Sequence, residues 1–100
     1  WTINLVKDES AAEAQYLLAE LFFNKNENKQ ALETLYTLNE NFITQEYWIG
    51  KSYLLIGKIF ISMNENFQAT ATLSSLIENS KIDEIREEAS NLLLEINTNE

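Results

Sequence analysis

Acidic side chains are the most abundant groups in this sequence that could do chemistry. The chain has no histidine and no cysteine, so the commonest general base and the thiolate metal ligand are both absent. Asp83, Glu84, Glu87 and Glu88 form a dense acidic cluster, and Asp83 and Glu87 are four positions apart, on one face of a helix. Carboxylate oxygens bind Ca²⁺ and Mg²⁺, so a cation site is one interpretation of this cluster.

A plainer interpretation of the acidic cluster is favoured. Acidic side chains in the first turn of a helix are stabilised by the helix dipole, and Arg86 within the cluster would compete with a cation. Paired carboxylates also serve acid–base catalysis in glycosidases. However, 16 acidic residues in 100 make chance pairs unavoidable, and no nucleophile or glycine-rich loop accompanies them. We therefore expect no catalytic residue, no metal ion and no cofactor.

Composition restricts the fold and the partners. The chain is long enough for one domain, and it contains no proline and only two glycines, which favours an all-α fold over one with many sharp turns. No apolar run is long enough to span a bilayer, so no membrane insertion is predicted. The net charge of −9 argues against nucleic acid, whose phosphates attract basic surfaces.

An internal repeat sets the elements that position these side chains. Residues 26–41, NENKQALETLYTLNEN, recur 38 positions later at 64–79 as NENFQATATLSSLIEN, with ten of sixteen positions identical. A fixed period of this length is typical of repeat architectures. Apolar stripes and capping residues predict five helices: one from Ser10 to the break at Asn24, then 28–41, 45–62, 66–79 and 82–97. The short connections make neighbouring helices antiparallel.

The two units resemble the tetratricopeptide repeat, a helix–turn–helix unit of about 34 residues. The family places a small residue and then an aromatic in the first helix, and a small residue early in the second. The matching residues are Ala19, Phe22 and Ala31 in the first unit and Gly57, Phe60 and Ala69 in the second. Leu18 and Leu35, matched by Ile56 and Leu73, take the inner apolar positions. The family's proline and tryptophan are missing, and the 38-residue spacing is about one helical turn longer.

The resemblance implies a single domain over 1–100 that forms a short right-handed α-solenoid. In this interpretation 1–9 is the remnant of a preceding helix, 11–43 and 44–80 are the two repeats, and 82–97 is a terminal capping helix. The longer spacing is similar to that of long bacterial members, and the last helix without a partner indicates the C-terminal part of a longer solenoid. The expected location is therefore the bacterial cytoplasm or periplasm, as a soluble protein. An exposed apolar N-terminal face would then allow self-association. Trp48 is expected to be a structural aromatic.

The family binds extended peptides or partner helices in a groove that its first helices form. The predicted groove residues are Tyr16, Glu20, Phe23, Asn24, Lys51, Leu54, Lys58 and Ile61. A rival interpretation is that Glu13 and Glu20 simply pair with Lys51 and Lys58, which would contribute little. Two functions stay open: a non-catalytic scaffold that binds a protein or peptide partner, and a purely structural cap with no ligand of its own.

Overall fold

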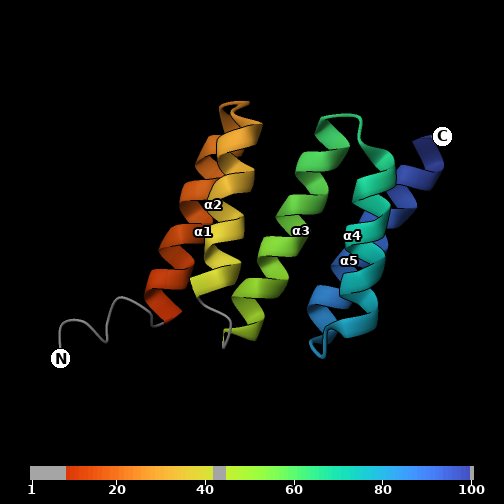
Figure 1. The fold of residues 1–100 in the computed structure, drawn as a ribbon. Helices are drawn as coiled ribbons and strands as arrows, with labels where there is room; N and C mark the ends of the chain where they lie inside the picture. Colours follow the sequence, from red (N-terminus) through yellow and green to blue (C-terminus); the bar gives the residue numbers. More distant parts are fainter. Residues whose placement is uncertain (1–8, 42–44, 100) are drawn as a thin grey trace, which may run out of the picture.

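The computed structural model describes residues 9–41 and 45–99, which form five α-helices (Figure 1). The helices are α1 Glu9–Asn24, α2 Asn28–Asn41, α3 Glu46–Ser62, α4 Asn66–Asn79 and α5 Asp83–Asn99. The prediction of an all-α fold of antiparallel helical hairpins is therefore confirmed over this part of the chain. The predicted remnant of a preceding helix lies outside the described residues, except that Glu9 is the first residue of α1. The expected start of α1 at Ser10 is thus one residue late.

The duplicated Asn-Glu-Asn segments form the two hairpin turns. Asn26 and Asn64 adopt left-handed backbone conformations with φ of 64° and 61°, which asparagine tolerates better than most residues. In the first turn the Asn26 N–H donates to the Phe23 carbonyl at 3.0 Å, and the Glu27 N–H donates to the Phe22 carbonyl at 2.9 Å. The second turn repeats both bonds. This is the Schellman arrangement, which satisfies the last carbonyls of a helix.

The packing order of the helices also repeats (Figure 1). Helices α1 and α2 pack as one hairpin and α3 and α4 as the next, and α3 lies against both α1 and α2. Helix α5 occupies the equivalent place against α3 and α4. As a result α1, α3 and α5 lie side by side in one row. No helix among the described residues is long and apolar enough to cross a membrane.

Small residues allow the two helices of each hairpin to approach closely. Ala19 and Ala31 are fully buried in the first hairpin, and Gly57 and Ala69 are buried in the second. A Cβ atom added to Gly57 would lie 2.8 Å from Cδ2 of Leu73, closer than carbon atoms pack. The buried apolar side chains form two clusters, one between the first hairpin and α3 and one between α3, α4 and α5. The other predicted packing residues lie in or against these clusters: Phe22, Leu35, Phe60 and Leu73.

One predicted inner position is wrong. Leu18 is 43% exposed, whereas Ile56, its counterpart in the second repeat, is 2% exposed. Ile56 packs into the cluster that the first hairpin forms. Leu18 occupies the same place on α1, but no described hairpin lies in front of α1 to cover it.

Candidate interaction surface

The row of α1, α3 and α5 presents one shared surface, which we call the row face. A cleft of about 300 Å³ opens on it between all three helices. Its lining residues are Phe23 from α1, Lys58 and Ile61 from α3, and Leu92 and Glu95 from α5. The cleft thus combines an apolar floor with one positive and one negative side chain.

Aromatic side chains lie on the same row face, two helical turns from the cleft. Tyr16 is seven residues before Phe23 on α1, and Lys51 is seven residues before Lys58 on α3, so each pair shares a face of its helix. The Tyr16 and Trp48 ring centroids are 5.6 Å apart, and the Lys51 Nζ lies 5.8 Å from the Tyr16 ring, within range of a cation–π interaction. Tyr47 packs edge-on against Trp48 at 5.0 Å. Trp48 therefore packs against neighbouring aromatic rings, although its buried Nε1 has no hydrogen-bond partner among residues 9–41 and 45–99.

Tyr16 keeps its proton throughout the neutral range. Burial of the ring raises the pKa of its hydroxyl to about 12, and the carboxylates of Glu20 and Glu88 act in the same direction. A phenol with so high a pKa is a poor general base near pH 7. Its packing against Trp48 and Lys51 indicates that Tyr16 shapes the surface.

The lysines of the row face do not form the ion pairs that the rival interpretation expects. Lys58 Nζ lies 3.9 Å from a carboxylate oxygen of Glu88 on α5, and both side chains are more than one-third exposed. Neither Glu13 nor Glu20 forms an ion pair with Lys51 or Lys58 in the described part of the chain. An exposed pair at this distance contributes little to stability, so Lys58 can exchange Glu88 for another carboxylate at low cost.

Not every predicted groove residue is accessible. Phe23, Lys58 and Ile61 line the cleft, Glu20 is half-buried and Asn24 is exposed. The prediction is wrong for Leu54, which is 1% exposed in the core cluster shared by α3, α4 and α5, because α3 has packed neighbours on both sides. Tyr16 is 7% exposed and offers only an edge.

The sequence reasoning missed Leu92 and Glu95, the two cleft residues of α5. It treated α5 as a cap for the end of the stack, and therefore assigned no groove residues to it. The signal that could have found them is the position of α5 after two repeats, where the first helix of a third repeat would stand. In that position the apolar stripe of α5 continues the groove of α1 and α3. The packing of α5 against α3 and α4 shows that it takes this place.

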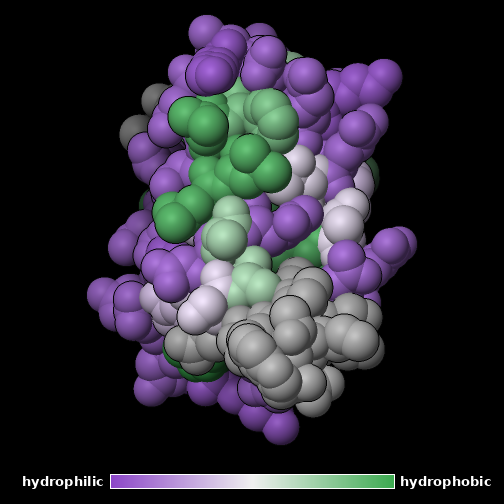
Figure 2. All heavy atoms as spheres, turned by 90° about the vertical axis from the view of Figure 1, so that its left-hand side faces the viewer, coloured by the Kyte–Doolittle hydropathy of each residue, from purple (hydrophilic) through white to green (hydrophobic). Residues whose placement is uncertain are grey.

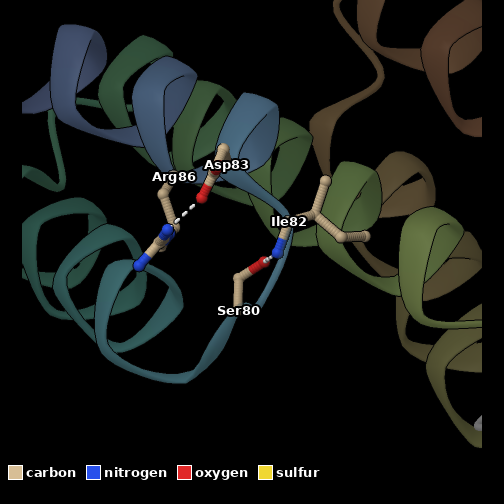
Figure 3. Close-up of polar contacts among 4 residues, drawn as sticks. All are labelled: Ser80, Ile82, Asp83 and Arg86. Carbon is tan, nitrogen blue, oxygen red and sulfur yellow. Dashed lines mark hydrogen bonds and ion pairs between the residues drawn. The ribbon is translucent and has the colours of Figure 1, made fainter.

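The acidic cluster at the start of α5 does not converge on one point. Asp83 forms an ion pair with Arg86 one turn further along the helix (Figure 3), and Glu88 faces Lys58 on the row face. Before the helix, the Ser80 hydroxyl accepts a hydrogen bond from the Ile82 N–H at 3.2 Å (Figure 3). No group of three or more acidic residues that could hold a metal ion occurs within 9–41 and 45–99.

A larger cleft of about 630 Å³ lies away from the predicted groove, between α3 and α4 and beside the loop to α5. Ile49 and Tyr53 of α3, Ser75 and Asn79 of α4, and Ile82 of the loop contribute to its lining. None of the predicted groove residues and none of the acidic cluster lines it. The row face therefore remains the surface on which the predicted site and an observed cleft coincide.

Comparisons with known proteins add no neighbour to this description. The chain matches no protein-family model, no curated protein and no solved structure. The candidate surface consequently stands on the geometry of this chain alone.

Proposed function

We propose that this chain is a non-catalytic interaction scaffold of the tetratricopeptide type, which binds an extended peptide or a partner helix on its row face. The cleft between Phe23, Ile61 and Leu92 is the observation that carries the proposal, because it joins all three helices of the row. The repeated hairpin turns and the small residues at both hairpin crossings support the assignment to this repeat type. A right-handed solenoid is part of the same proposal.

The chemistry of the row face suggests what the partner offers. An apolar side chain fits the floor of the cleft, where Phe23, Ile61 and Leu92 meet. Lys58 stands at the rim, and its weak contact with Glu88 leaves it available to a carboxylate. The preferred partner is therefore a segment with an apolar residue next to an acidic one, even though the chain as a whole is acidic.

Selection from a displayed random-peptide library tests this proposal. Peptides that bind the chain should be enriched in an apolar residue beside an acidic one, and their affinity should fall at least about tenfold on Ile61→Ser or Lys58→Glu, a loss of about 1.4 kcal/mol. Phe67→Ser is the matched control, because Phe67 is 87% exposed on α4, outside the row. Peptides that bind both groove variants as tightly as the unaltered chain would contradict the proposal.

The alternative function is a structural cap at the end of a longer helical stack. The exposed side of α5 favours it, because the polar side chains of Glu87, Ser90, Asn91 and Glu95 surround the exposed Leu94 there, which makes this side better suited to water than to a further helix. A library that yields no binding peptide would favour this alternative.

A further inference from the structure

Helix α1 carries an apolar patch on the side that faces away from the rest of the molecule. Leu17, Leu18 and Leu21 are spaced so that they share one face of the helix, and they are 50%, 43% and 49% exposed. Figure 2 shows apolar atoms gathered on this end of the molecule. We call these three residues the leucine patch. Single exposed leucines are ordinary on a protein surface, but a contiguous group marks an interaction site.

The internal repeat shows what covers the same positions elsewhere in this chain. Moving 38 residues along the sequence, the leucine patch corresponds to Leu55, Ile56 and Ile59 of α3. These three residues are 2% exposed or less, and they pack into the cluster that α1 and α2 form. Equivalent positions are therefore buried wherever a helical hairpin precedes them, and the leucine patch continues this series of interfaces by one step.

The surface that covers Leu55, Ile56 and Ile59 indicates what chemistry a neighbour needs in order to cover the leucine patch. It contains Leu35 and Leu38 of α2, both fully buried. It also contains Asn39, whose side-chain oxygen accepts a hydrogen bond from the buried Ser52 hydroxyl at 2.8 Å. The residue equivalent to Ser52 on α1 is Ala14, so the neighbour of α1 needs no asparagine there.

We infer that the leucine patch docks a further antiparallel helical hairpin whose second helix presents leucines as α2 presents Leu35 and Leu38 to α3. The opposite end of a second copy does not meet this requirement. Its exposed α5 surface carries Glu87, Asn91 and Glu95, with Leu94 as its exposed large apolar side chain. Burying such carboxylates without partners is unfavourable, so copies of this chain do not stack head to tail.

Insertion of a second copy of residues 8–45 directly before residue 8 tests the inference in the full chain. The insertion keeps the 38-residue period and places the surface of α1 and α2 in front of the original α1. The extended chain should melt at least about 5 °C higher than the unaltered one. Leu18→Ser in the original α1 should lower the Tm of the extended chain by at least about 5 °C more than it lowers the Tm of the unaltered chain.

Phe67→Ser serves as the control, because it removes an exposed apolar side chain away from the leucine patch and should act equally in both chains. Methyl NOEs between Leu18 and the inserted hairpin report the contact directly. An inserted hairpin that stays unfolded, or a Leu18→Ser effect of equal size in both chains, would overturn the inference. The inference would also be overturned if the unaltered chain forms a dimer that Leu18→Ser abolishes, while Leu18→Ser leaves the Tm of the extended chain unchanged. The occupant of the leucine patch would then be a second copy of the chain. Peptide binding at the row-face cleft should be unaffected by Leu18→Ser.

Discussion

Deleting the same number of atoms at two equivalent positions should cost very different amounts of stability. Ile56→Ala and Leu18→Ala each remove three carbon atoms, and the two residues occupy the same place in the two repeats. Ile56 is 2% exposed and packs between the hairpins, whereas Leu18 is 43% exposed. Comparison of the two variants thus separates the stability that packing against a preceding hairpin contributes from the stability that arises within the repeat.

The expected costs follow from burial. Truncation of a buried isoleucine to alanine leaves a cavity and costs about 2–5 kcal/mol. The higher helix propensity of alanine offsets a few tenths of a kcal/mol of this loss. Three buried carbons are worth about 2.4 kcal/mol at about 0.8 kcal/mol each. Because Leu18 is already 43% exposed, its truncation should cost at most about 1.4 kcal/mol. We expect a net loss of about 3 kcal/mol for Ile56→Ala.

Urea unfolding followed by far-UV circular dichroism measures both losses, with tryptophan fluorescence as a second probe. The m value should be unchanged in both variants, so that the difference lies in the free energy of unfolding and not in the surface that unfolding exposes. Repeating the measurement at several protein concentrations removes any contribution from association through Leu18. Losses that agree within about 0.5 kcal/mol would refute the view that a preceding hairpin decides the burial of this position.

Three further predictions concern packing and pH. Gly57→Ala should destabilise the chain by about 1 kcal/mol in urea unfolding, because the clash of its Cβ with Leu73 at 2.8 Å typically costs about 1–3 kcal/mol and the helix regains about 1. Ala31→Leu and Ala69→Leu should each cost about 1–3 kcal/mol, and unchanged melting of both would contradict the close crossings. The raised pKa of Tyr16, about 12 in the folded chain against 10.0, means that the unfolded chain loses this proton first as pH rises. Its contribution to stability is therefore complete below about pH 10, and up to about 3 kcal/mol is lost as the pH rises through 12. Tyr16→Phe should remove that part of the decline in alkaline denaturant titrations.

Local signals were sufficient for most helix boundaries. The predicted ranges 28–41 and 66–79 coincide with α2 and α4, because each helix follows an Asn-Glu-Asn turn whose first asparagine, Asn26 or Asn64, adopts positive φ and ends the preceding helix. The start of α1 was missed by one residue, since Glu9 and Ser10 are both acceptable in a first helical turn. The duplication of the turn and of the second helix also indicated the order in which the hairpins pack.

Burial at the row face was harder to predict. The helical period places Leu54 on the same stripe as Lys51 and Lys58, and it therefore entered the predicted groove, yet it is buried between α3, α4 and α5. The sequence pattern gives the direction of a side chain around its own helix. It does not say how closely the next helix approaches, and that distance decides whether a residue lines a cleft or fills a core.

The sequence by itself determined the all-α composition, the hairpin turns and the small residues at each crossing, because these depend on local backbone preferences and on a repeated pattern. Only the tertiary structure decided that Ile56 is core while Leu18 is surface, and that Leu92 and Glu95 complete a cleft with Phe23. The physical reason is that a side chain is buried only when the surface that carries it contacts a second surface. A residue type and its period describe one of them, and the neighbouring helix supplies the other.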